Sequence, residues 1–255
     1  AETEAIDISQ PNLKMRRKGH LHPMTHVHND LEDLFTSMGF MVLDGPELES
    51  DYYNFEALNI PKTHPARDSQ DTFFIKGKPE WVMRTHTSPV QVRAMQKYGA
   101  PLRTVVTGRC FRNEATDASH DHSFYQMEGL VVDKNISIAN LIGTMKELLQ
   151  GVLKREVEVR LRPGYFPFVE PGFELDMKCL VCGGQGCGAC KHSGWVETLP
   201  CGLVNPRVIE AGGLDPKEWS GFAFGLGSMR LCMQKYGIED IRHLHSGDMR
   251  FLEQF

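Results

Sequence analysis

The chain has 255 residues, of which 41% are hydrophobic and 24% are charged, and its formal net charge is -5. This composition is that of a globular protein, and the negative charge excludes a broadly basic surface for nucleic acid, so any RNA contact must be local or come from a partner. No apolar run reaches the ~18 residues that a membrane-spanning helix needs, so we expect no membrane contact. No signal-peptide pattern is present, and four of the seven cysteines are closely spaced. A metal site in a reducing compartment explains that spacing, so we expect a cytoplasmic protein.

Residues 1–18 are predicted to form an N-terminal linker, and residues 19–255 are predicted to form one domain. The linker carries a basic run, Lys14–Lys18, which is either a solvated segment or a contact with RNA or a partner. A helix is predicted to begin at Pro23 and to end at Gly39, because apolar residues between them recur at helical spacing.

The apolar residues 40–43 predict a buried strand, and residues 59–72 predict a polar loop. Ser88 followed by Pro89 is typical of a helix N-cap and first helical position. The remaining predicted elements are strands at 102–112 and 124–133, a helix capped by Ser137, short strands at 157–162, 173–178 and 195–199, and a strand at 222–226 before a helix that ends near Gly237.

Adjacent strands and separate blocks of helices predict the fold class. Strand runs that follow one another directly favour antiparallel hairpins. Helices that occur in separate blocks favour an α+β protein over an alternating β/α protein. The sequence contains no Gly-x-x-x-x-Gly-Lys loop, so any bound nucleotide must be held by another device.

Polar side chains gather on one face of the strand pair 102–112 and 124–133. Because side chains alternate along a strand, Phe124, Gln126 and Glu128 share one face, and Arg112 shares a face of the partner strand with Cys110. An arginine fork suits phosphate, and a phenylalanine can stack on a flat base. The alternative is a solvent-exposed face with a cross-strand pair of arginine and glutamate.

These strands resemble a known family. Gly108–Glu114, Thr116–His120 and Phe124–Gly129 resemble motif 2 of class II aminoacyl-tRNA synthetases, and they are close in wording to the alpha subunit of the bacterial phenylalanyl enzyme. The resemblance implies an antiparallel sheet flanked by helices and a ligase that activates phenylalanine with ATP and transfers it to tRNA(Phe). It implies ATP contacts from Arg112, Glu114, His120 and Phe124, and amino-acid contacts from Gln126 and Glu128.

Other segments resemble the same family in the same order along the chain. Gly19–Pro23 and the helix after it resemble motif 1, which builds the dimer interface. Arg84–Gln91 resembles the amino-acid segment, which implies substrate contacts from His86, Ser88 and Gln91. Tyr165–Pro171 resembles the specificity strand, where Phe166 and Phe168 would meet the substrate ring and Glu170 would bind Mg²⁺ together with a beta subunit.

The segment Gly221–Arg230 resembles motif 3 of that family. The resemblance implies that Arg230 binds the γ-phosphate and acts with Arg112 in catalysis, and that Ala223 and Gly225 line the amino-acid site. The family generally has glutamate before this arginine, whereas this chain has Met229. The implied partners are a beta subunit in an alpha2-beta2 heterotetramer, tRNA(Phe), ATP and phenylalanine. The alternatives are a class II relative with another amino acid or acceptor, and a non-catalytic binding subunit, which only Met229 favours.

Four cysteines form two Cys-x-x-Cys pairs, Cys179 with Cys182 and Cys187 with Cys190. Each pair can chelate one tetrahedral ion, and the glycines between them permit tight turns. Zinc is the expected ion, with an iron–sulfur centre or four unliganded thiols as alternatives. Because residues 179–192 lie between two predicted hairpin strands, the sequence predicts a structural insertion at a loop tip.

Overall fold

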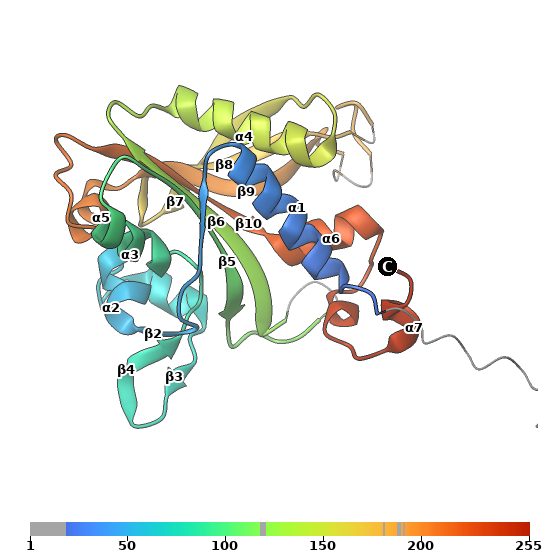
Figure 1. Ribbon diagram of the computed structural model, residues 1–255, viewed down its shortest axis with the longest axis horizontal. Helices are drawn as coiled ribbons and strands as arrows, with labels where there is room; N and C mark the ends of the chain where they lie inside the picture. Colours follow the sequence, from blue (N-terminus) through green and yellow to red (C-terminus); the bar gives the residue numbers. More distant parts are fainter. Residues whose placement is uncertain (1–18, 118–120, 181, 188–189, 191) are drawn as a thin grey trace, which may run out of the picture.

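A seven-stranded mixed sheet forms the centre of the protein (Figure 1). The structure, a computed structural model, describes residues 19–117, 121–180, 182–187, 190 and 192–255; the predicted linker and His120 lie outside them. The strands run in the order β1-β5-β6-β10-β9-β8-β7. Their bounds are β1 Met41–Leu43, β5 Leu102–Phe111, β6 Ser123–Asp133, β7 Val159–Phe166, β8 Val169–Lys178, β9 Trp195–Val204 and β10 Ser220–Gly227.

Helices cover both faces of this sheet (Figure 1). One face packs against α1 (Pro23–Ser37), α4 (Ile138–Leu153) and α6 (Ser228–Tyr236), and the other packs against α3 (Pro89–Tyr98) and α5 (Pro206–Ala211). The predicted α+β class and antiparallel hairpins are therefore confirmed, with one parallel pair, β1 with β5. The short elements are α2 Asp51–Asn54, η1 Glu56–Leu58, η2 Pro65–Gln70, η4 Ile241–Leu244, α7 Met249–Leu252, and a small sheet of β2 Leu48–Ser50, β4 Lys78–Met83 and β3 Phe74–Ile75.

Two helix ends that the sequence predicted are confirmed. Ser137 accepts a hydrogen bond from the Asn140 amide, and the Asn140 side chain accepts one from Ser137 in return, so α4 begins with a capping box. The α6 helix ends at Gly237, whose φ of 69° is the left-handed conformation that glycine adopts without strain.

The predicted buried strand at residues 40–43 is wrong in its burial. Phe40 is buried, but Met41 and Val42 are 41% and 40% exposed because β1 is the edge strand of the sheet. An apolar run predicts a strand without showing whether that strand is central or at an edge. The small sheet was not predicted from the sequence. Its shortest strand, β3, has only two residues.

Strand β10 divides large and small side chains between its two faces. Phe222, Phe224 and Leu226 pack in the core with α1, α4 and α6, whereas Ala223 packs with the cluster on the other face. The Phe224 ring stacks on Phe35 at 5.7 Å and occupies the place that a side chain at position 129 would need, which explains glycine there.

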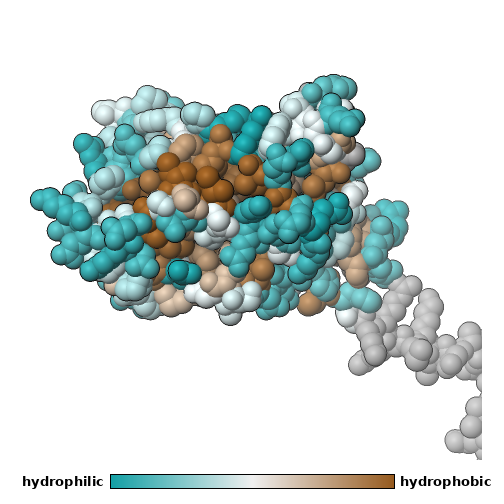
Figure 2. All heavy atoms as spheres, turned by 90° about the horizontal axis from the view of Figure 1, so that it is seen from above, coloured by the Kyte–Doolittle hydropathy of each residue, from teal (hydrophilic) through white to brown (hydrophobic). Residues whose placement is uncertain are grey.

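The side of the molecule that carries α4 has an apolar centre. Figure 2, which views the molecule from that side, shows hydrophobic residues gathered in the middle of the face and hydrophilic residues around them. On α4, which runs along this side of the molecule in Figure 1, Ile142, Val152 and Leu153 are only partly buried. Among the described residues, no helix has the length and apolarity needed to cross a bilayer.

Candidate active site

The segment from Arg84 to Gln91 covers the polar face of β5 and β6, so that face is not exposed to solvent. Glu128 on β6 is only 4% exposed. Its carboxylate accepts hydrogen bonds from the Ser88 hydroxyl at 2.5 Å, the Gln91 amide at 3.1 Å and the Thr87 backbone N–H at 3.2 Å. Burial raises the pKa of Glu128, and these three donors act in the opposite direction by stabilising the charged form. The alternative of an open face with an Arg–Glu pair is therefore wrong.

Ser88 occupies the N-cap position of α3 and Pro89 the first helical position, as the sequence predicted. The Ser88 side chain makes no cap hydrogen bond, however, because its backbone is already helical and its hydroxyl donates to Glu128. The start of the helix therefore lies inside the site, and the serine there holds the buried carboxylate instead of the helix end.

His86 is buried, with 3% of its surface exposed, and it directly precedes Thr87, whose backbone N–H donates to Glu128. Its Nε2 lies 2.8 Å from the carbonyl oxygen of Asn54. A carbonyl can only accept a hydrogen bond, so Nε2 carries the proton and Nδ1 remains an acceptor. Burial, with Arg112 and Arg84 nearby, lowers the pKa of His86 to about 4, so the ring is neutral at physiological pH.

Glu128 also lines a pocket that contains two phenylalanines, Phe166 and Phe168, and that is called the aromatic slot below. Phe166 and Phe168 stack with ring centroids 6.0 Å apart, and His86 meets Phe168 edge to face at 6.1 Å. Ala223 and Gly225 on β10 line the same pocket. The residues that line this pocket are Gln91, Gln126, Glu128, Phe166, Phe168, Val169, Pro200, Cys201, Ala223, Phe224 and Gly225.

A second pocket contains the residues predicted to bind the nucleotide. Arg112, Glu114, Phe124 and Arg230 line it, together with Asp121, Tyr125, Gly227, Met229 and Ile241. The Arg112 guanidinium lies over the Phe124 ring at 4.9 Å, and its Nε donates to the Thr85 carbonyl at 3.2 Å. Met229 is 2% exposed and packs into the core, so a glutamate there would have to be buried.

Arg84 is a residue of this site that the sequence did not single out. It is 2% exposed, and its guanidinium donates to the carbonyls of Arg109 on β5 at 2.8 Å and Gly45 at 2.9 Å. Its own carbonyl accepts a hydrogen bond from Phe111, the residue before Arg112. A Cβ at Gly108 would overlap the guanidinium, so this glycine within a predicted strand was a signal of a close approach.

Glu170, the predicted magnesium ligand, lies outside both pockets at the start of β8. It is exposed, and the Asn205 side-chain amide donates to its Oε2 at 3.2 Å. Mg²⁺ prefers six oxygen ligands, usually one or two carboxylates and several waters. The exposed carboxylate of Glu170 would supply one of these ligands, and the remaining ligands would have to come from water or another chain.

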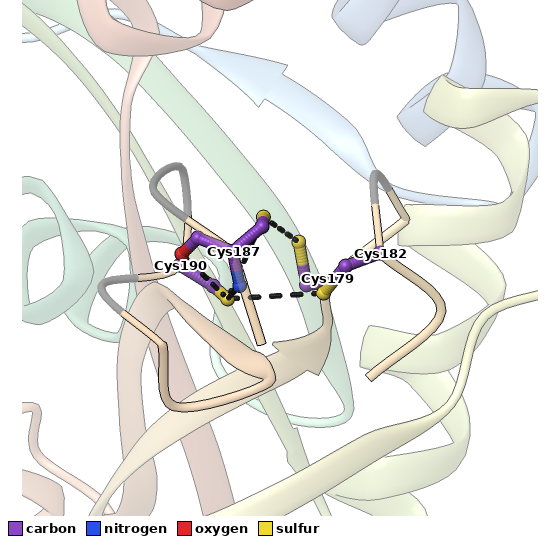
Figure 3. A group of neighbouring side chains, drawn as sticks. All are labelled: Cys179, Cys182, Cys187 and Cys190. Atoms are coloured by element: carbon purple, nitrogen blue, oxygen red, sulfur yellow. Dashed lines mark hydrogen bonds between the residues drawn. The ribbon is translucent and has the colours of Figure 1, made fainter. Parts of the chain in front are cut away.

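The four cysteines lie together between β8 and β9, as the sequence predicted. Their Sγ atoms are all within 4.8 Å of one another, and Figure 3 shows them turned inward. All four are free thiols. Although partial burial raises the pKa of Cys190, backbone N–H groups of Cys187 and Gly194 outweigh it and bring that pKa to about 6.

Most of the predicted residues line one of two pockets or form the separate cysteine cluster, and Glu170 lies outside both pockets. Gln126 and Glu128 line the aromatic slot, whereas Phe124 on the same strand and Arg112, which directly follows β5, line the second pocket. On β10, Gly225 lines the slot and Gly227, two residues further along, lines the second pocket. His120 lies outside the described residues.

Comparison with known proteins agrees with this geometry. The family described as tRNA synthetases class II core domain (F) matches residues 5–255. The phenylalanine–tRNA ligase alpha subunit of Leptospira biflexa is 58% identical over 253 residues, which cover 99% of this chain and 73% of that protein. The alpha subunits of Anoxybacillus flavithermus and Streptococcus uberis are 50% and 51% identical, and the matches cover 99% and 100% of this chain and 73% of each of those proteins.

A solved structure is similar in fold. The pyrrolysyl-tRNA synthetase of Desulfitobacterium hafniense superposes with a TM-score of 0.65 over 90% of this chain and 75% of that chain, at 17% identity. The fold and the site therefore define a class II aminoacyl-tRNA synthetase core. Within that class, the chain belongs to the family of phenylalanine–tRNA ligase alpha subunits.

Proposed function

We propose that this chain is the catalytic alpha subunit of a phenylalanine–tRNA ligase, with residues 19–255 as the catalytic domain. One observation carries the proposal. A slot of apolar and aromatic side chains includes the buried, triply hydrogen-bonded carboxylate of Glu128, and the same two strands, β6 and β10, also carry residues of a second pocket lined by two arginines. Such a slot suits an amino acid with a flat apolar side chain, and the arginines suit a polyphosphate.

The amino acid would be held at both ends. Glu128 and the Gln126 amide would bind the ammonium group, and the Nδ1 acceptor of neutral His86 would add a polar contact, with Ser88 and Gln91 holding Glu128 in place. The benzyl ring would lie between Phe166 and Phe168 on one side and Ala223 and Gly225 on the other. The two rings stack at 6.0 Å and would present their edges or faces to the substrate ring, both favoured aromatic geometries.

The reaction would need no side-chain nucleophile. A carboxylate oxygen of phenylalanine attacks the α-phosphorus of ATP, the bond from that phosphorus to the bridging oxygen breaks, and pyrophosphate leaves with the electron pair. Arg112 would bind the α-phosphate and Arg230 the γ-phosphate, with Phe124, Glu114 and His120 supporting the nucleotide. Because these groups are already placed before reaction, positioning and charge stabilisation would supply most of the catalysis.

In the second step, a terminal ribose hydroxyl of tRNA(Phe) attacks the carbonyl carbon of the phenylalanyl adenylate, and AMP leaves. Mg²⁺, a cation that class II cores use, would neutralise phosphate charge when bound, and we assign Glu170 as one of its ligands. A structural zinc ion in the four-cysteine cluster of the 179–192 insertion completes the proposed metals.

A beta subunit is the proposed partner, in an alpha2-beta2 heterotetramer in the cytoplasm. Apolar side chains near α1 support an interface there: Leu21, Met41 and Met249 are 52%, 41% and 60% exposed. Covering such residues is favourable by about 25 cal/mol per Å² of apolar surface. The net charge of -5 makes a partner that supplies basic surface for tRNA a reasonable complement.

The test is amino-acid-dependent exchange of pyrophosphate into ATP, followed by charging of tRNA(Phe), with the protein co-expressed with its beta subunit. We expect exchange with phenylalanine to exceed that with each of the other nineteen amino acids. A preference for another amino acid would identify a different class II ligase. If the intact complex binds no ATP, the chain is a binding subunit that has kept the fold.

A further inference from the structure

The four sulfur atoms are spaced as ligands of a single tetrahedral ion. Three pairs, Cys179 with Cys187, Cys182 with Cys190, and Cys187 with Cys190, have Sγ–Sγ distances of 3.8 Å (Figure 3). Zinc–sulfur bonds of ~2.3 Å at tetrahedral angles place thiolates about 3.8 Å apart. A disulfide would need ~2.05 Å. The spacing therefore fits an ion bound at the centre.

Backbone amides surround the sulfurs as they do around metal thiolates. Gly186 N–H donates to Cys182 at 3.2 Å, and the N–H groups of Cys187 and Gly194 donate to Cys190 at 3.1 and 3.3 Å. Such outer contacts orient thiolates and spread their negative charge. They require the connection to fold back on itself, and glycine allows it: a Cβ at Gly194 would overlap the Gly184 carbonyl.

The cluster closes the β8–β9 hairpin. Lys178 and Trp195 form the last pair of the ladder, and directly beyond them the Cys179 N–H donates to the Gly194 carbonyl at 2.9 Å. Cys179 begins the connection, and Cys190 lies near its end. An ion bound to both would fix the point at which the two strands meet.

We propose that the zinc ion assigned to this cluster holds the register of β8 against β9 and thereby the shape of the amino-acid pocket. The link to that pocket rests on its proposed function. Val169 on β8 and Pro200 on β9 line it, at a distance along the same two strands from the cysteines.

Two features explain why this hairpin would need a metal clamp. Its ladder is irregular between Leu175 and Asp176, where the pairing shifts by a residue. A slip of one residue turns every following side chain to the opposite face of the sheet. The connection is also rich in glycine, with positive φ at Gly183, Gly184 and Gly186, and ordering glycine costs more entropy than ordering other residues.

Zinc fits better than an iron–sulfur cluster. Four thiolates within 4.8 Å of one another converge on one centre, whereas a multi-iron cluster spreads its cysteines over several iron atoms. A closed site with four thiolates is the usual form of structural zinc. No open coordination position is left for a substrate, so the ion would be structural.

The experiment measures metal content in the complex with its beta subunit. We expect one zinc atom per alpha chain in the wild type and less than about a tenth of that in the double variant Cys187→Ser with Cys190→Ser. Cys232→Ala, which removes a buried thiol on α6 that is not part of the cluster, should keep its zinc. Absence of metal after growth in zinc-rich medium, or iron with acid-labile sulfide, would overturn the assignment.

The clamp has its own readouts. In the double variant we expect faster amide hydrogen exchange over residues 174–199, a midpoint of thermal unfolding lower by about 5 °C or more, and a KM for phenylalanine raised ~3-fold or more with the KM for ATP unchanged. Loss of zinc with unchanged exchange and unchanged KM would refute the clamp. If the wild type instead activates a different amino acid, the proposed function fails while the zinc content and exchange results still stand.

Discussion

The Ser88 hydroxyl donates a hydrogen bond of 2.5 Å to Oε2 of Glu128, within a site where both residues are almost fully buried. A buried carboxylate stays charged only when donors replace the water it has lost. Ser88 therefore controls how readily Glu128 can meet a cationic group, although it lies on a different segment of the chain. Four predictions follow from contacts of this kind around the site.

Replacing Ser88 with alanine should weaken phenylalanine binding. Removing a hydrogen bond to a charged group costs about 1.5–3 kcal/mol, or roughly 10- to 100-fold in kcat/KM. The pKa of Glu128, already raised by burial, should rise further, so the KM for phenylalanine should begin to climb at a higher pH than in the wild type. Pyrophosphate exchange measured from pH 5 to 8 tests both effects. Ser37→Ala, at an exposed hydroxyl on α1, is the control, and equal KM values for the two variants would contradict the prediction.

His86 should make stability depend on pH. Its pKa is about 4 in the folded protein against 6.5 unperturbed, because burial disfavours the charged ring. The unfolded chain binds a proton below 6.5 and the folded chain does not until about 4, so stability is lost as pH falls through this window, by ~3 kcal/mol in all.

Urea unfolding at pH 7 and pH 4.5 measures this loss. His86→Asn cannot titrate, so it should lose ~2–3 kcal/mol less than the wild type across that interval. The exposed His243→Gln should behave like the wild type. If His86→Asn shows the same slope as the wild type, His86 is not the group responsible.

Arg84 should be required both for stability and for the placement of Arg112. Lysine cannot reach the carbonyls of Arg109 and Gly45 together, so Arg84→Lys leaves a buried acceptor unpaired, at a cost of about 1–3 kcal/mol. Because the Arg84–Thr85 backbone receives hydrogen bonds from Phe111 and Arg112, kcat for pyrophosphate exchange should fall ~10-fold in the fraction that remains folded. Arg103→Lys is the control, because Arg103 is exposed on β5, the strand that also carries Arg109. This variant should change neither the stability nor kcat. Stability lost without any loss of kcat would confine Arg84 to a structural role.

Ala223 should set the room available for the substrate ring. Ala223→Val adds two methyl groups to a wall that already faces Phe166 and Phe168, so kcat/KM for phenylalanine should fall ~10-fold or more. The KM for ATP should change less than ~2-fold, because Ala223 does not line the second pocket. Ala139→Val on the exposed side of α4 controls for the added bulk. An equal loss for both substrates would mean that the substitution has disturbed the sheet rather than the slot.

Much of the sheet was predictable because its strands are apolar runs, several of which follow one another directly as hairpins do. The polar face of β6 was also predictable, since Gln126 and Glu128 cannot both be core residues without partners. The partners themselves were not predictable by pattern: Ser88 resembles an ordinary helix cap, and only the fold shows that Glu128 takes its hydroxyl. Similarly, Arg84 follows three apolar residues and precedes a polar segment, and only the fold shows that its guanidinium is buried against the backbone at Gly108.

The burial of the edge strand was predicted wrongly and the small sheet was not predicted, for different reasons. Phe40 and Met41 belong to one apolar run, yet the first is buried and the second is 41% exposed, because strand order is decided by distant parts of the chain. The small sheet has strands of two to six residues, too short for a periodic signal to develop.

Strand β10 alternates large and small residues: Phe222 and Phe224 pack in the core, and Ala223 and Gly225 line the amino-acid pocket. A change at position 223 or 225 therefore alters the wall of the amino-acid pocket, and a change at position 222 alters the core beneath α1, α4 and α6. Phe224 belongs to both, because it packs in that core and also lines the pocket, so a change there would affect packing and the pocket together.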